Sequence, residues 1–149
     1  MCDLTRARDL LQQGAYTCVL CKGEVTYTSN SIGIAPMLDF LDAGYDMRGF
    51  CAADRIVGRA AALLFVLANI QAVYADVISE GAVKVLETHG IKVSYRDKTP
   101  YIINRQGDGP CPMERAVADT EDPAQAECAI RRAVEQLRKD RGTANHEKQ

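Results

Sequence analysis

The pattern of apolar and polar positions predicts short helices and strands in a mixed order. Apolar residues recur at helical spacing from Leu4 to Gln13, and Gly14, a residue that commonly follows a helix, comes next. Two runs rich in β-forming residues follow, from Tyr16 to Cys21 and from Glu24 to Thr28. The Lys22-Gly23 pair between them predicts a hairpin with a tight turn.

The middle of the chain predicts one strongly apolar helix among shorter elements. A helix is expected from about Pro36 to Asp42. Residues 53–68 are apolar nearly all round, as in a helix buried at the centre of a domain. A strand is expected over residues 73–78, and Ser79 is placed to cap a helix that runs to His89.

The last part of the chain predicts further strands and two helices. Gly90 supplies the left-handed residue that closes a helix, and residues 91–95 form the next strand. A strand, a helix and a strand with short connections imply a parallel pair with a right-handed crossover. Residues 101–103 offer another strand, and a short helix begins near Pro112. Asp122-Pro123-Ala124-Gln125 has the N-cap, proline and capping-box pattern of a helix start.

Composition indicates one ordinary folded domain. The chain has 149 residues, of which 47% are hydrophobic and 26% charged, and both fractions are close to globular averages. We assign the domain to residues 1–140 and expect a disordered polar tail over residues 141–149. The formal net charge of -2 lacks a basic excess, so no nucleic-acid partner is expected. The longest apolar run, Ala60 to Ala68, is too short to span a bilayer and the polar start is no signal peptide, so we expect a cytoplasmic protein without a membrane partner.

The cysteines and histidines do not form an obvious reactive or metal-binding set. The six cysteines are expected to be free thiols, because the cytosol keeps thiols reduced. Cys18 and Cys21 have C-x-x-C spacing, but in a strand their side chains point to opposite faces, so we interpret them as packing residues. Of the two histidines, His89 ends a helical pattern and His146 lies in the polar tail. No metal and no cofactor is therefore expected.

Four short motifs carry a family resemblance. They are Ser31-x-Gly33-Ile34-x-Pro36, Asp54-x-x-Val57-Gly58-x-Ala60-Ala61, Val73-Tyr74 with Ile78-Ser79, and Asn104-Arg105-x-Gly107-Asp108-Gly109-x-Cys111-Pro112-Met113-Glu114. The last motif is the most specific. Over about residues 15–135 this pattern resembles the domain of unknown function 1893 family, a deaminase-like group without the deaminase motif. The resemblance implies an α/β fold: a three-layer α/β/α cytidine-deaminase-like sandwich with a mixed sheet of about five strands.

The element order is also similar to that of the cytidine deaminases. Residues 54–62 take the place of the deaminase helix that opens with a His or Cys ligand and the catalytic Glu, and residues 73–80 resemble the strand before the Pro-Cys-x-x-Cys helix. A zinc deaminase needs three soft ligands and a Glu beside the metal-bound water. Neither residues 57–60 nor residues 79–83 contain a Cys or His, so zinc deamination is disfavoured.

The candidate site lies beyond the carboxyl ends of the strands, where helix amino ends favour anions. We expect a cleft there that binds a small anionic or nucleotide-like molecule. Arg59 or Arg105 could hold a phosphate or carboxylate, and Asp54 or Asp108 could accept bonds from a ribose or base. The residues expected to contact the ligand are Asp54, Arg59, Ser79, Glu80, Asn104, Arg105 and Asp108.

Two other functions stay open. Cys111 precedes a helix whose amides would stabilise a thiolate and Glu114 lies one turn further on, so these two residues are the candidate catalytic or redox pair. A tight turn with Cys111 simply packed is the plainer interpretation, because no histidine base lies nearby. The other function is a structural or subunit-interaction module with a filled cleft. A homo-oligomer is expected by resemblance alone.

Overall fold

A five-stranded mixed sheet forms the centre of the computed structural model, which describes residues 2–103 and 111–147, with side chains through residue 140. The strands are β1 (Cys18–Lys22), β2 (Val25–Ser29), β3 (Cys51–Val57), β4 (Ala72–Ser79) and β5 (Lys92–Thr99). Their order in the sheet is β2-β1-β3-β4-β5. β1 is antiparallel to both β2 and β3, whereas β3, β4 and β5 are parallel. The predicted hairpin, the predicted parallel pair and the α/β class are confirmed.

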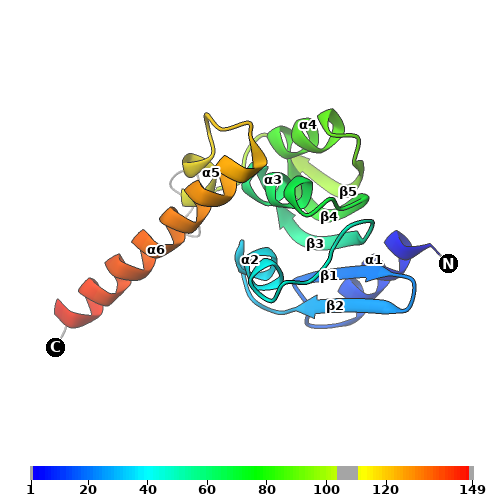
Figure 1. The fold of residues 1–149 in the computed structure, drawn as a ribbon, viewed down its shortest axis with the longest axis horizontal. Helices are drawn as coiled ribbons and strands as arrows, with labels where there is room; N and C mark the ends of the chain where they lie inside the picture. Colours follow the sequence, from blue (N-terminus) through cyan, green and yellow to red (C-terminus); the bar gives the residue numbers. More distant parts are fainter. Residues whose placement is uncertain (1, 104–110, 148–149) are drawn as a thin grey trace.

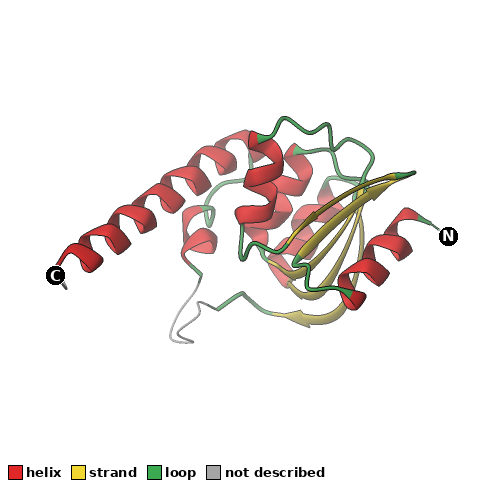
Figure 2. Ribbon diagram, turned by 90° about the horizontal axis from the view of Figure 1, so that it is seen from below, coloured by secondary structure: helices red, strands yellow, loops and turns green. Residues whose placement is uncertain are grey.

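Helices lie on both faces of the sheet (Figures 1 and 2). They are α1 (Asp3–Gln13), α2 (Ala35–Asp42), α3 (Arg59–Leu67), α4 (Glu80–Thr88), α5 (Pro112–Ala116) and α6 (Pro123–Glu147). Figure 2 shows α1 on one side of the sheet and the other helices on the opposite side. None of the described helices is long and apolar enough to cross a membrane.

The sheet separates two buried apolar clusters. The larger one lies on the α3 side and includes the fully buried residues Leu63, Leu64 and Phe65. The smaller one lies under α1 and includes Leu11. Cys18 belongs to the larger cluster and Cys21 to the smaller one. The two cysteines therefore face opposite sides of β1, as the strand geometry predicts.

The predicted helix over residues 53–68 is wrong in its first part. Cys51–Val57 is the central strand β3, and α3 starts at Arg59, after Gly58. β3 is paired on both edges and covered on both faces, so most of its residues are buried. A strand of this kind lacks the alternation of apolar and polar positions, and its pattern cannot be distinguished from that of a buried helix. Residues 101–103 do not add a strand to this sheet; β5 instead continues to Thr99.

Three predicted helix ends are confirmed by their capping contacts. The Ser79 hydroxyl accepts a hydrogen bond from the Ala82 amide at 3.1 Å. Gly90 follows α4 with a φ of 74°. Asp122 Oδ1 accepts a hydrogen bond from the Ala124 amide at 2.8 Å at the start of α6. α6 itself continues to Glu147 and projects away from the body (Figure 1), so the segment expected to be disordered from residue 141 is helical up to that residue.

Candidate functional site

The amino ends of α3 and α4 lie side by side at the carboxyl ends of the parallel strands β3 and β4. β3 leads through Gly58 into α3, and β4 ends at Ser79, the N-cap of α4. Val57 and Ile78 are partners in the parallel register, which places the two helix starts next to each other. The structure thus brings together three of the predicted site residues: Arg59, Ser79 and Glu80. Ser79 is buried and engaged as a cap, whereas Glu80 is exposed.

A carboxylate from another helix occupies the amino end of α3. Glu114, in α5, accepts hydrogen bonds from the Arg59 amide at 2.6 Å through Oε1 and from the Ala60 amide at 2.8 Å through Oε2. These amides have no partner within α3, and a negative charge there is favoured by the helix dipole. A Cβ atom at Gly58 would lie 2.6 Å from Glu114 Cδ. Residue 58 must therefore lack a side chain for the carboxylate to reach the helix.

The Arg59 side chain makes the reciprocal contact. Its Nε donates to the Val117 carbonyl at 3.2 Å and its Nη2 donates to the Thr120 carbonyl. The guanidinium thereby holds the segment that follows α5, and Val117 itself is fully buried. We call the contacts of Glu114 with α3 and of Arg59 with residues 117 and 120 the α3–α5 clamp. Sequence analysis selected both Arg59 and Glu114 as site residues. It did not predict that Glu114 would bond the amides of α3 or that Arg59 would bond the carbonyls that follow α5.

Cys111 stands at the N-cap position of α5 and is half-buried. Its amide donates to the Ile102 carbonyl at 3.1 Å, and its side chain packs against the larger apolar cluster. Both carboxylate oxygens of Glu114 are bonded to α3 amides. A catalytic role for Cys111 with Glu114 stays a prediction. Asn104, Arg105 and Asp108, also predicted to contact a ligand, lie outside the described residues.

Asp54 lies within β3 and not at a helix start. It is buried and directly opposite Cys18 in the antiparallel register. Burial raises the pKa of Asp54 to about 8. Burial, together with the nearby Asp54, raises the pKa of the Cys18 thiol well above its usual range. At neutral pH the two facing groups are therefore mainly protonated and uncharged.

Sequence analysis missed a polar cluster around the buried Asp76 on the α1 face. Asp76 Oδ1 accepts hydrogen bonds from Gln12 Nε2 at 2.7 Å and from the Tyr74 hydroxyl at 2.9 Å, and Oδ2 accepts from Arg55 Nη1 at 3.0 Å. Burial acts to raise the pKa of Asp76, but these hydrogen bonds outweigh it and lower the pKa. Arg55 also donates to the Leu11 carbonyl at 2.6 Å. The cluster therefore fastens the carboxyl end of α1 to the sheet.

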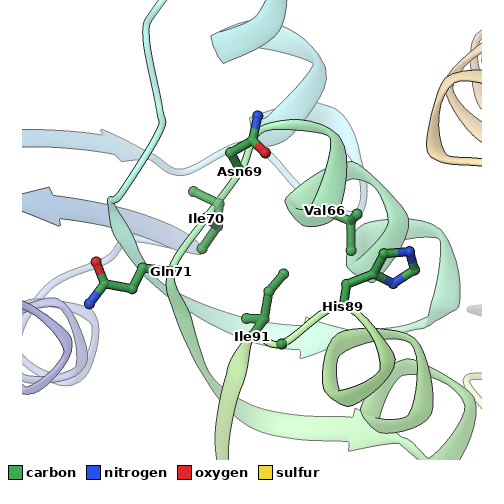
Figure 3. A pocket seen from close by; sticks show the side chains of 7 residues that line it. Val66, Asn69, Ile70, Gln71, His89 and Ile91 are labelled. Atoms are coloured by element: carbon green, nitrogen blue, oxygen red, sulfur yellow. The ribbon is translucent and has the colours of Figure 1, made fainter.

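A hollow of about 310 Å³ lies at the other end of the parallel strands, by the carboxyl ends of α3 and α4 (Figure 3). Val66, Ile70 and Ile91 point into it, whereas Asn69 and Gln71 point away. Helix carboxyl ends carry partial negative charge, which disfavours anions. The hollow is thus no substitute for the predicted anion site. Among the described side chains, no three of His, Cys, Asp or Glu are grouped so that they could hold a metal ion.

The fold is that of an α/β domain in which the amino end of α3 is capped by a carboxylate of the same chain, that of Glu114. The chain belongs to the family described as "Domain of unknown function (DUF1893)", whose model matches residues 6–134. The crystal structure of a DUF1893 family protein from Thermotoga maritima is 26% identical, with a TM-score of 0.76, and the match covers 90% of this chain and 89% of that one. The predicted family is confirmed.

Similarity to deaminases is more distant. A diaminohydroxyphosphoribosylaminopyrimidine deaminase/5-amino-6-(5-phosphoribosylamino)uracil reductase from Thermotoga maritima is 15% identical, with a TM-score of 0.41. That match covers 63% of this chain and 35% of the other protein. No curated protein matches the chain.

Proposed function

We propose that the site at the amino ends of α3 and α4 binds a small anionic or nucleotide-like molecule. In the unliganded protein, Glu114 is the anion that occupies this site. The observation that carries the proposal is the carboxylate held by the Arg59 and Ala60 amides at 2.6 and 2.8 Å. A phosphate or carboxylate of a ligand carries the same charge and accepts the same hydrogen bonds. Ligand binding would then displace Glu114 from α3.

Two features of Glu114 favour its displacement by a ligand. The carboxylate belongs to α5, a helix of five residues that follows directly on the Cys111 turn. Its hydrogen bonds to α3 are only partly buried, so solvent reaches the contact. An external anion must nevertheless replace a group that is already tethered, and a tethered group has a high effective concentration. Weak binding by the wild-type chain and tighter binding after removal of the carboxylate are therefore expected.

Thermal unfolding with added anions tests this proposal. The probes are inorganic phosphate and a panel of nucleoside monophosphates, applied to the wild type and to Glu114→Ala. A ligand that binds only the folded state raises Tm by mass action, and the rise should be larger for Glu114→Ala. Glu121→Ala is the matched control, because Glu121 is exposed and lies between α5 and α6, close to Glu114 in the chain. No anion-dependent rise in either protein would refute the proposal.

A structural or interaction module is the second candidate, favoured by the Arg59 contacts. Arg59 donates to the Val117 and Thr120 carbonyls, so its charge already serves the connection between α5 and α6. In this case the α3–α5 clamp is permanent and the former cleft is filled. Glu114→Ala would then lose stability without gaining any response to phosphate. The same thermal experiment therefore separates the two functions.

A further inference from the structure

Two buried cysteines face each other across neighbouring strands under α1. Cys21 in β1 and Cys51 in β3 are directly opposite in the antiparallel register, and both are buried. Directly opposite residues have Cα atoms about 4.5 or 5.5 Å apart, depending on the kind of pair. A disulfide spans Cα separations of about 4.4–6.8 Å. The register thus meets the backbone requirement for a disulfide between these two residues.

A third cysteine, Cys2, is exposed at the start of α1. Its Sγ accepts a hydrogen bond from the Thr5 amide at 3.4 Å, as the N-cap of the helix. The next residue, Asp3, accepts a hydrogen bond from the Gly23 amide at 3.2 Å. Because Gly23 lies in the turn that follows β1, this bond fastens the start of α1 beside the end of that strand. Cys2 is therefore held near the buried pair.

The thiols of Cys2 and Cys51 have pKa values shifted in opposite directions. Hydrogen bonds from the Thr5 side chain and amide lower the pKa of the Cys2 thiol. Burial raises the pKa of Cys51, and the nearby charges of Asp3, Cys2 and Cys21 raise it further. The thiolate is the reactive form, so Cys2 should react first with a reagent from solution.

The guanidinium of Arg6 lies beside Cys21 and has one N–H group without a hydrogen-bond acceptor in the described part of the chain. Among the described residues, the Arg6 Nη2 is the buried side-chain nitrogen that lacks a hydrogen-bond partner, and it lies 3.7 Å from Asp3 Oδ1. Interaction with Cys21 raises the pKa of the Arg6 guanidinium. A thiolate on Cys21 would accept the free N–H and satisfy this donor. The buried pair therefore has a group that stabilises the charge formed during exchange.

We propose that Cys2, Cys21 and Cys51 form a thiol–disulfide site that is oxidised by a low-molecular-weight disulfide, with Cys2 as the entry thiol and Cys21–Cys51 as the final disulfide. The Cys2 thiolate attacks one sulfur of the reagent, forming a mixed disulfide and releasing one thiol. Cys51 then attacks Cys2 Sγ and releases the second thiol. Cys21 finally attacks Cys51 Sγ and returns Cys2 to its thiolate. Overall, two protein thiols are oxidised and one disulfide is reduced to two thiols.

The site is independent of the anion site proposed above, and the chain offers matched controls. Cys18 is on the same strand as Cys21 but faces the larger apolar cluster on the other side of the sheet. Cys128 is exposed on α6, a helix that packs against α3 and α5. Neither should take part in the final disulfide. An exposed thiol that reacts only by chance would behave like Cys128.

The test uses the full-length reduced protein and glutathione disulfide as the probe. Peptide mapping by mass spectrometry without reduction should show one main intramolecular disulfide, between Cys21 and Cys51. Cys2→Ser should form the same disulfide about tenfold more slowly, whereas Cys128→Ser should keep the wild-type rate. If the wild type forms no disulfide, or if the main product joins other cysteines, the site is refuted. Equal rates for the wild type and Cys2→Ser would overturn the entry role of Cys2.

Discussion

Removing the Glu114 carboxylate should destabilise the whole domain, and the structure sets the size of the effect. Glu114→Ala removes two hydrogen bonds to amides at the first turn of α3, together with a favourable charge at the helix dipole. The contact is partly buried, so water can replace part of what is lost. Because two hydrogen bonds and a dipole interaction are lost, the cost should still lie in the upper part of the range for loss of an N-cap, about 2 kcal/mol. For a domain of this size the fall in Tm should be roughly 4–8 °C.

A double-mutant cycle with Gly58 makes this prediction specific. In Gly58→Ala the added Cβ would meet Glu114 Oε2 at 2.9 Å and Cδ at 2.6 Å, so the carboxylate must leave its place. The φ of Gly58 is -99°, which alanine adopts readily, so no backbone strain adds to the cost. Gly58→Ala alone should therefore cost about as much as Glu114→Ala. In the Glu114→Ala background it should be neutral, giving a coupling energy of about 2 kcal/mol.

Urea unfolding of the four proteins, followed by circular dichroism, measures the cycle. Glu121→Ala, an exposed control in the same part of the chain, should change stability by less than about 0.5 kcal/mol. The reasoning is refuted if the costs of Gly58→Ala and Glu114→Ala simply add, because additive costs would mean that the two residues do not share a contact.

Three further outcomes follow from other contacts. Burial raises the pKa of Asp54 from 3.8 to about 8. Between these two pH values unfolding releases the proton, so wild-type stability should fall relative to Asp54→Asn as pH rises. A pH-independent difference between their urea midpoints would contradict this prediction. Asp76→Asn leaves Arg55 without its buried partner and should cost about 2 kcal/mol in urea unfolding, whereas an unchanged midpoint would mean that the ion pair contributes nothing. Arg59→Ala should speed hydrogen exchange in α5 and the start of α6, and Arg59→Lys should rescue little because a lysine cannot bond two carbonyls in a fork; full rescue would count against the clamp geometry.

Local rules predicted the parts of the fold that depend on neighbouring residues. The Ser79 cap and the Asp122 cap involve atoms within three residues of each other, so their sequence patterns are sufficient. β3 was misassigned because its two covered faces remove the alternation that identifies a strand. The Arg55–Asp76 ion pair joins neighbouring strands, and no local signal indicates that these two charged residues will pair.

The contact between Arg59 and Glu114 was not predicted from the sequence. Arg59 and Glu114 were both selected, one for a helix amino end and the other for its motif. Their contact spans 55 positions of the chain, and it depends on where α5 packs in the finished fold. Such a contact cannot be derived from spacing. Gly58 offered the available signal, because a glycine at the end of a buried strand often marks close approach by another group.

The α3–α5 clamp also bears on how the protein is made. The amino end of α3, at the centre of the molecule, is completed only by residues 114, 117 and 120. Val117, Ala126 and Ile130 are fully buried in the same core as α3. A nascent chain that has emerged only as far as β5 therefore still lacks part of its interior. Stable folding must wait until the ribosome has released the start of α6, and a polypeptide shortened before residue 114 should be a target for proteases.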